Sequence, residues 1–204
     1  MDFEENVSEE VTSDPVVIKK ENTFLEYLRD FTAVIVVIML LFFLFFRIII
    51  VSGPSMNDTL EHGDMVLLVS RVFYRNPKQG DVIVASKDSF RNGEPIIKRV
   101  IATEGQVVDI DFISGTVTVD GVVLDESDYI KGTTVDHEGM QFPLVVEKGH
   151  VFVLGDNREV SLDSRSKEIG LIDTRQILGK AVFIMLPGEN EQHKREFGRI
   201  GVLH

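Results

Sequence analysis

The sequence predicts a mostly β domain that is attached to a single N-terminal transmembrane helix. A largely apolar run from Phe31 to Val51 predicts the helix, because about twenty such residues cross a hydrocarbon core of roughly 30 Å. Beyond this run, short β-branched segments separated by turn residues are typical of strands. The chain therefore divides into an acidic segment over residues 1–30, an anchor over 31–51 and a β domain over 52–204.

Charge distinguishes the N-terminal segment from the anchor. Residues 1–30 carry nine acidic and three basic side chains and few apolar ones, so we expect no packed structure there. A cleaved signal sequence usually has a basic start and an apolar stretch of about 7–15 residues. The acidic start and longer stretch of this chain favour a retained anchor. Basic residues flank both ends of the anchor, so the charge pattern alone leaves its orientation open.

Arg47 interrupts the apolar run near its C-terminal end. In one interpretation its guanidinium reaches the lipid head groups, and Ile48 to Val51 forms the first strand of the β domain. In the other, the helix continues to Val51 with Arg47 near its end. Both interpretations place Ser55 within a few residues of the membrane surface.

Eight further runs predict the strands of one domain that is long enough to bury a core. They are Met65 to Ser70, Asp81 to Ala85, Ile96 to Ala102, Val107 to Ile110, Thr116 to Val119, Val122 to Leu124, Val151 to Leu154 and Ala181 to Met185. Between the fifth and sixth lies Asp120-Gly121, which predicts a hairpin because a two-residue type I′ turn requires two residues at positive φ.

The composition argues against several classes of partner and cofactor. A formal net charge of −12 makes nucleic acid an unfavourable partner. The chain has no cysteine, and its five histidines show no ligand spacing, so we expect neither a metal site nor another cofactor.

Ser55 is the candidate nucleophile, because Ser52-Gly-Pro-Ser-Met56 forms a turn directly after the anchor. A serine nucleophile needs a group that accepts its proton. The Gly-x-Ser-x-Gly elbow is absent around Ser55. His62 follows seven residues later, but Glu61-His-Gly-Asp64 has the composition of an exposed turn.

Lys98 is the better candidate for the base. It lies in Pro95-Ile-Ile-Lys-Arg-Val-Ile101, where β-branched neighbours would hold the amine in apolar surroundings. Such burial disfavours the charged form and lowers the pKa of a lysine from about 10.4. The alternative is an ordinary lysine on an edge strand that points into water. Two interpretations are equally open for the apolar segments 48–52 and 82–85 and for Met56. They could form the walls of a substrate pocket, or they could be part of the core.

Four segments, in this order after an anchor, resemble those of the type I signal peptidases, membrane-bound Ser-Lys proteases that remove signal peptides from exported proteins. The segments are Ser52 to Leu60, Gly80 to Val84, Lys98 to Val100 and Gly155 to Arg165. The match covers roughly residues 48–186. Residues 101–153 leave no room for a large inserted domain, so the chain is most similar to the single-anchor bacterial forms.

The resemblance implies a role for each matching residue. Ser55 corresponds to the nucleophile, Lys98 to the general base, and Ser161 to the serine that hydrogen-bonds and orients the lysine. The backbone N–H of Ser55 would stabilise the oxyanion. The supporting positions are Gly53, Met56, Arg99, Asp156, Asp163 and Arg165. The family also implies an N-terminus on the cytoplasmic side of the cell membrane and an extracytoplasmic catalytic β domain. It further implies preprotein signal peptides as partners and cleavage after small residues.

Three departures from the family pattern stand out. Asp58 replaces the proline of the usual Ser-Met-x-Pro-Thr-Leu, so the turn after Ser55 is less constrained in φ. Gly53 stands where some members carry a serine that adds an oxyanion donor. Ala102-Thr-Glu-Gly-Gln106 replaces the customary Gly-x-Pro-Gly-Asp.

Three functions are consistent with these observations. An active signal peptidase is favoured, because the serine, the lysine and Ser161 are all present. A non-catalytic, membrane-tethered homologue would not need all three. A Ser-Lys self-cleaving repressor would need a DNA-binding domain, where this chain has an acidic tail and a membrane span.

Overall fold

The computed structural model describes residues 23–87, 90–189 and 194–203, with residues 1–39 and 40–204 as two compact units. The expected acidic segment over residues 1–30 lies outside the described residues as far as residue 22. Helix α1 (Thr23–Phe45) has no buried residue, and it is long and apolar enough to cross a membrane.

Helix α1 begins and ends earlier than the expected anchor over 31–51. Glu26 in its first described turn complements the positive end of the helix dipole. At the other end, Phe46–Ile50 forms strand β1, which pairs antiparallel with the strand over Met65–Ser70. The interpretation in which the helix continues to Val51 is therefore wrong. A strand does follow the helix, but it covers Phe46–Ile50 instead of Ile48 to Val51, and Arg47 belongs to it and pairs with Leu68.

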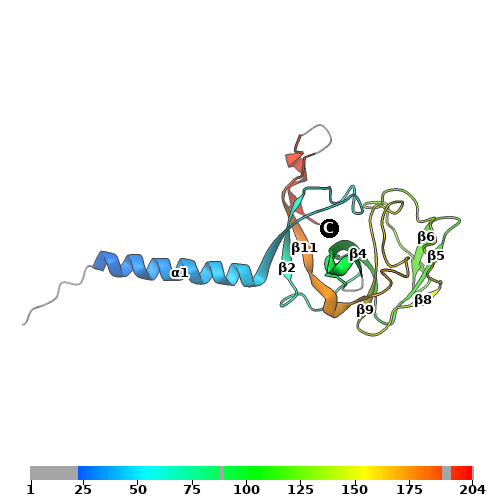
Figure 1. Ribbon diagram of the computed structural model, residues 1–204, viewed down its shortest axis with the longest axis horizontal. Coiled ribbons are helices and arrows are strands. Elements are labelled where there is room, and N and C mark those ends of the chain that lie inside the picture. The colour runs from blue at the N-terminus through cyan, green and yellow to red at the C-terminus, as the bar shows by residue number, and fades with distance from the viewer. Residues whose placement is uncertain (1–22, 88–89, 190–193, 204) are drawn as a thin grey trace, which may run out of the picture. The chain divides into compact units, whose positions relative to one another are not determined.

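The unit over residues 40–204 contains two sheets (Figure 1). Its strands after β1 (Phe46–Ile50) are β2 (Met65–Ser70), β3 (Val82–Ser86), β4 (Pro95–Thr103), β5 (Val107–Asp111), β6 (Thr116–Val119), β7 (Val122–Val123), β8 (Leu144–Val145), β9 (His150–Leu154), β10 (Ile172–Asp173), β11 (Ile177–Leu186) and β12 (Gly201–Val202). Among the described residues, 3₁₀ turns cover Arg91–Gly93, Thr174–Gln176 and Phe197–Arg199.

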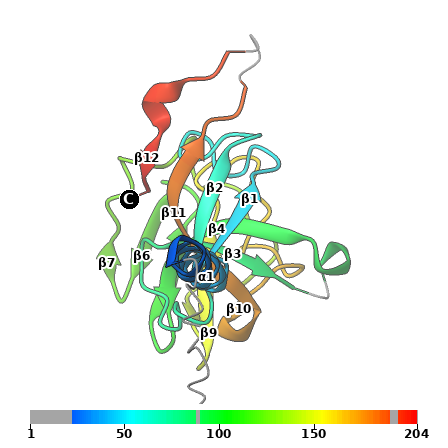
Figure 2. The same cartoon turned by 90° about the vertical axis from the view of Figure 1, so that its left-hand side faces the viewer.

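The larger sheet carries the candidate site. Its strand order is β1-β2-β11-β3-β4-β9-β10, with β12 paired to β11, and Figure 2 shows β1, β2 and β11 side by side. The smaller sheet has the order β7-β6-β5-β8. Ile101, Phe152 and Leu154 of the larger sheet pack with Val108 and Val117 of the smaller one in a shared buried cluster. This packing makes the two sheets one domain.

Each of the eight predicted runs overlaps a strand, and the predicted hairpin is confirmed. Asp120 and Gly121 both have positive φ, 53° and 78°, between β6 and β7. The sequence did not predict β8, β10 and β12. Each has only two residues, and such short pairings depend on a neighbouring strand rather than on a periodic pattern.

Candidate active site

Ser55 lies in a loop that connects β1 to β2 and is closed at its base by backbone hydrogen bonds. The Val51 N–H donates to the Asp64 carbonyl, and the Gly63 N–H donates to the Val51 carbonyl, each at 2.9 Å. Met56 and Leu60 point into the core beneath the loop and are fully buried. Met56 therefore packs beneath the loop and holds it against the sheet.

Gly53 and His62 support the turn before Ser55. Gly53 has φ +89°, a region that side chains other than glycine rarely adopt. Its N–H donates to Nδ1 of the exposed His62 at 3.3 Å. With no side chain, Gly53 supplies no hydroxyl donor to the site. The backbone N–H of Ser55 itself finds no acceptor among the described residues, so it is available to a ligand.

Lys98 reaches Ser55 from the interior of the larger sheet. Its Nζ is 2.8 Å from Ser55 Oγ and donates to the Ile97 carbonyl at 3.0 Å. Strand β4 is paired with β3 on one side and β9 on the other, and only 5% of Lys98 is exposed. The alternative of a solvent-facing lysine on an edge strand is therefore wrong.

Burial lowers the pKa of the Lys98 amine from 10.5 to about 8, because a charged ammonium loses its hydration inside the protein. The carboxylates of Asp163, Asp156 and Glu138 oppose this shift, while the Arg165 guanidinium assists it. Close to neutral pH a sizeable fraction of the amine is uncharged. Such an amine can accept a proton from the hydroxyl that it contacts.

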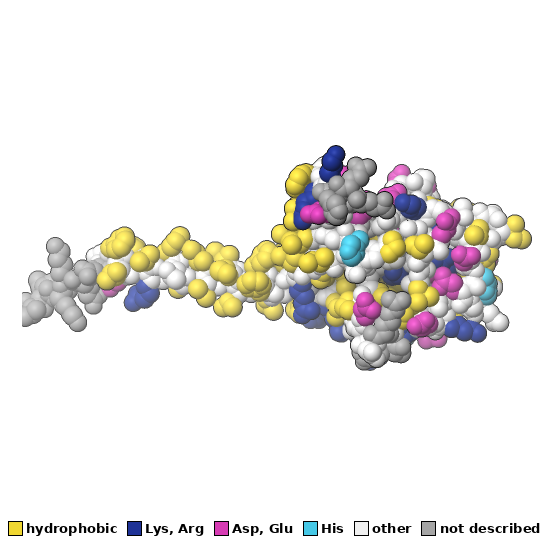
Figure 3. All heavy atoms as spheres, turned by 45° about the horizontal axis from the view of Figure 1, so that its top comes forward, with side chains coloured by type: hydrophobic (Ala, Val, Ile, Leu, Met, Phe, Trp, Pro, Cys, Tyr) yellow, Lys and Arg dark blue, Asp and Glu magenta, His cyan; other side chains and the backbone are white. Residues whose placement is uncertain are grey.

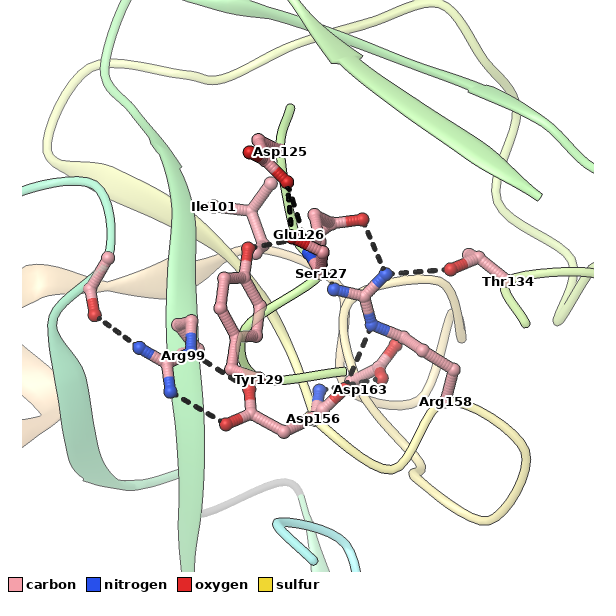
Figure 4. A network of polar contacts seen from close by, with 12 residues as sticks. Arg99, Ile101, Asp125, Glu126, Ser127, Tyr129, Thr134, Asp156, Arg158 and Asp163 are labelled. Carbon is pink, nitrogen blue, oxygen red and sulfur yellow. Dashed lines mark hydrogen bonds and ion pairs between the residues drawn. The ribbon is translucent and has the colours of Figure 1, made fainter. Parts of the chain in front are cut away.

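Asp156 joins three segments behind the serine and the lysine. Arg99, which follows Lys98 and points to the opposite face of β4, binds its carboxylate through Nε at 2.9 Å and Nη2 at 2.7 Å. Thr59 Oγ1, from the loop of Ser55, donates to the same carboxylate at 2.6 Å. Figure 4 shows Arg99 beside both Asp156 and Tyr129, whose ring centroid lies 4.1 Å from the guanidinium carbon. One buried carboxylate thus sets the spacing of the two candidate catalytic segments.

Asp163 and Arg165 secure the loop over residues 155–165. Arg165 Nε is 2.9 Å from one oxygen of Asp163, and the other oxygen accepts from the Gly155 N–H at 3.0 Å. Arg165 Nη2 also donates to the carbonyls of Arg158 and Ser161. Both side chains of the pair are fully buried. Their combined contacts hold the backbone on each side of Ser161.

Ser161 is placed beside the Ser55 loop, but it makes no hydrogen bond to Lys98. Its Oγ is buried and has no partner among the described residues. A Cβ on Gly155 would lie 2.1 Å from Ser161 Oγ and 2.5 Å from the Ser55 carbonyl oxygen. Gly155 is therefore required for space, because only a residue without a side chain lets these two serine segments approach so closely.

The structure adds residues that sequence reasoning did not assign to the site. Asn157 donates through its N–H to the Ser55 carbonyl and through Nδ2 to the Pro54 carbonyl, both at 3.1 Å. Arg158 forms a buried ion pair with Glu126 and also donates to Thr134 (Figure 4). The sequence identifies Asn157 only as a polar residue of a turn and does not indicate that it contacts the Ser55 loop. Nothing in the sequence indicates the pairing of Arg158 across 32 positions.

An apolar groove of about 570 Å³ ends at Ser55 and Lys98. Its walls include residues 49–52 of the expected segment 48–52, Val84 of the expected segment 82–85, and Met56. The remaining lining residues are Arg47, Gly53, Pro54, Leu68, Phe90, Glu94, Pro95, Ile96, Ile97, Val160, Leu162 and Leu178. Several of these residues, such as Val51 and Val84, are also core. Val51, Met56 and Val84 are thus both groove lining and core, whereas Val82, Ile83 and Ala85 belong to the core only.

Two further features concern the loop contact of Asp58 and the question of a metal site. Asp58 is exposed and pairs with Lys131 at 3.0 Å, so the residue that replaces the usual proline ties the Ser55 loop to a neighbouring loop. Within the described ranges, no three His, Cys, Asp or Glu side chains are grouped as a metal site would need.

A mostly β domain whose apolar groove ends at a serine and a buried amine has the features of a peptidase. The family model described as signal peptidase, peptidase S26, matches residues 24–186, and the chain belongs to this family. Its type is that of the signal peptidase I enzymes, and its reaction is the removal of signal peptides. Together with helix α1, this membership indicates a membrane-anchored protein.

Named relatives are similar over most of the chain. A signal peptidase I of Bacillus amyloliquefaciens is 28% identical over 86% of this chain and 92% of its own length. Signal peptidase IB of Staphylococcus aureus is 36% identical over 70% of this chain and 79% of its own length. A signal peptidase I crystal structure from Enterococcus faecalis has a TM-score of 0.41 and 28% identity, covering 52% of this chain and 96% of that chain.

Proposed function

We propose that this chain is a Ser-Lys endopeptidase that cleaves signal peptides from exported preproteins after small residues. The observation that carries the proposal is the contact of 2.8 Å between Lys98 Nζ and Ser55 Oγ, made by an amine whose pKa is lowered to about 8. A neutral amine at hydrogen-bond distance from a hydroxyl is the arrangement that general-base activation of a serine requires.

The reaction follows from this arrangement. Lys98 accepts the Ser55 proton while Oγ attacks the scissile carbonyl carbon. The resulting oxyanion lies near the Ser55 N–H, which strengthens its hydrogen bond as charge develops. Lys98 then donates its proton to the leaving amine, which becomes the new N-terminus of the mature protein. In the second half, Lys98 takes a proton from water, the hydroxide attacks the acyl-enzyme, and Ser55 leaves with the proton.

Three of the supporting residues act through position. Asp156, held by Arg99 and Thr59, keeps the two catalytic segments at a fixed distance. The Asp163–Arg165 pair holds the Ser161 backbone next to the Ser55 loop. Ser161 would orient the lysine amine by accepting a hydrogen bond from it once substrate is bound.

Specificity and location complete the proposal. Val51, Pro54 and Ile97 line the groove together with Ser55 and Lys98, and their apolar surface favours small apolar side chains before the scissile bond. The catalytic domain is extracytoplasmic and α1 crosses the cell membrane once, with the N-terminus inside. This orientation brings Ser55 close to the membrane surface, where a signal peptide is exposed.

The test is cleavage of a purified preprotein by the full chain in lipid nanodiscs, with the new N-terminus of the product sequenced. Ser55→Ala and Lys98→Ala should each abolish cleavage and leave the circular dichroism spectrum unchanged. The matched controls are Ser114→Ala and Lys148→Ala, which remove an exposed serine and an exposed lysine. Retained cleavage in either dyad variant would refute the assignment. A folded wild type without activity would favour a tethered binding homologue.

Specificity and orientation each need a separate measurement. A preprotein with a bulky residue directly before the scissile bond should not be cleaved. Because the chain has no cysteine, a single cysteine at Ser114 should react with a membrane-impermeant maleimide on intact cells. A cysteine in the N-terminal segment should react only after lysis, and the reverse pattern would contradict the proposed orientation.

A further inference from the structure

A second hollow, separate from the groove, lies at the C-terminal end of the apolar helix. It has a volume of about 630 Å³, and four arginines line it, Arg47, Arg71, Arg75 and Arg175. No acidic side chain is among its described lining residues. This concentration of positive charge is unexpected on a chain with a formal net charge of −12.

Three of these arginines have no acidic partner among the described residues. Within the described part of the chain, neither Arg47 nor Arg75 forms an ion pair or side-chain hydrogen bond, and Arg71 donates only to the Arg175 carbonyl. Arg175 differs, because Asp173 binds its guanidinium at 2.5 Å and balances its charge. The hollow therefore presents a net positive charge of about three. Ser70, Tyr74 and Thr174 add hydroxyl groups to its lining.

The surroundings of the hollow are apolar on the side of the helix. Phe45, the last residue of α1, stacks on Phe73 with ring centroids 3.7 Å apart and an interplanar angle of 13°. Val72 and Phe73 lie between Arg71 and Arg75, and both are about half exposed. Figure 3 shows dark-blue basic side chains on the domain beside the yellow apolar side chains at this end of the helix. Exposed apolar side chains next to arginines are typical of a segment that lies in a membrane interface.

We propose that this arginine-lined hollow binds the phosphate of an anionic phospholipid head group. Guanidinium groups bind phosphate oxygens through two parallel hydrogen bonds, and the three arginines without an acidic partner supply more than enough positive charge to attract such a head group. Phe73 and Val72 would enter the acyl region beside Phe45, so that the site takes a lipid rather than free phosphate. The inference rests on the proposed membrane anchorage, but it does not depend on Ser55 or on catalysis.

Bound lipid at this position would also affect the groove. Arg47 and Leu178 line both hollows, and β1, which carries Arg47, continues directly into the Ser55 loop. An anionic lipid would therefore hold the entrance of the groove at the membrane surface.

The test measures lipid binding by the full chain in neutral detergent. Short-chain phosphatidylglycerol, short-chain phosphatidylcholine and inorganic phosphate are titrated separately and followed by calorimetry. Saturable binding is expected for phosphatidylglycerol alone. Each basic residue near a membrane surface contributes roughly a fivefold gain in affinity for anionic lipid, so Arg71→Gln with Arg75→Gln should weaken binding about thirtyfold. The double control Lys148→Gln with Lys167→Gln removes the same charge elsewhere and should leave binding unchanged.

Several outcomes would overturn the proposal. They are equal affinity of the wild type and the Arg71/Arg75 variant, equal binding of phosphatidylcholine, and equal binding of inorganic phosphate, which would indicate a phosphate site without a lipid. Arg71→Lys with Arg75→Lys keeps the charge and the fold, and it should restore part of the affinity. Ser55→Ala should bind phosphatidylglycerol like the wild type, so failure of the catalytic proposal and failure of the lipid site are separable.

Discussion

The pH dependence of cleavage gives the sharpest test of the role of Lys98. Burial lowers the pKa of its amine from 10.5 to about 8. This difference corresponds to about 3 kcal/mol in the balance between the charged and neutral forms. At pH 7 about one amine in ten would be neutral, compared with about one in three thousand for a lysine in water. Since only the neutral form can accept the Ser55 proton, activity should follow this fraction.

The expected profile has a defined shape. The kcat/KM for a signal-peptide substrate should rise about tenfold per pH unit up to about pH 7, reach half its maximum near pH 8 and level off above pH 9. The assay uses the full chain in neutral detergent from pH 5.5 to 10, with circular dichroism at each pH to show that the fold is retained. Ser55→Ala supplies the background rate.

Two results would refute this reasoning. A flat rate from pH 5.5 to 9 would exclude a lysine base. A rate that still rises tenfold per unit from pH 8 to 10 would mean that Lys98 is solvated rather than buried. Lys98→Arg should be inactive across the whole range, because a guanidinium remains protonated at every usable pH.

Four further changes have defined outcomes. Lys98→Met should be inactive, yet its free energy of unfolding at pH 7 should be about 2–3 kcal/mol higher than that of the wild type. Between pH 8 and 10.5 the unfolded amine binds more protons than the folded one, so the stability of the wild type rises with pH across this window. The variant has no amine and should lack this rise. Glu138→Gln removes a negative charge that raises the pKa of Lys98, so the acid limb should move to lower pH. Gly155→Ala places a Cβ 2.1 Å from a serine hydroxyl and should lower kcat at least tenfold. Arg199→Met leaves a buried carboxylate unpaired and should cost about 3 kcal/mol in urea unfolding.

Matched controls and contrary results distinguish these effects. Arg195→Met removes an exposed ion pair and should cost under about 1 kcal/mol; an equal loss in both arginine variants would contradict the account. Gly198→Ala, with no atom within 4 Å of its added Cβ, should retain activity. An acid limb that moves upward in Glu138→Gln would show that its charge does not act on Lys98. A stability curve of Lys98→Met that parallels the wild type from pH 8 to 10.5 would contradict burial of the amine.

Much of the fold could be predicted from local patterns. The β-branched runs and the Asp120-Gly121 turn have the periodicity and φ preferences that their structures require, and each formed as expected. The boundary between α1 and β1 could not be predicted, because Phe46–Ile50 is apolar enough for either structure. Pairing with β2 decides it, and pairing is a contact across the chain rather than a property of the segment.

The candidate site divides in the same way. Residue types and their order pointed to Ser55, Lys98 and the polar loop over residues 155–165, and the structure brings Lys98 to Ser55. The bond expected from Ser161 to Lys98 is not made in this structure. Asn157 and Glu138 were missed, since a polar residue in a loop has no sequence signal that names its partner.

The sequence by itself determined the apolar helix, the mostly β domain and the kinds of side chain that the chemistry uses. These depend on periodicity and on residue type, which are local. Only the tertiary structure decided that Lys98 is buried between β3 and β9, that Asp156 joins the segments of Ser55 and Lys98, and that arginines from separate strands and loops share one hollow. Desolvation, ion pairing and close approach depend on what surrounds a group in space, and distant parts of the chain supply those surroundings.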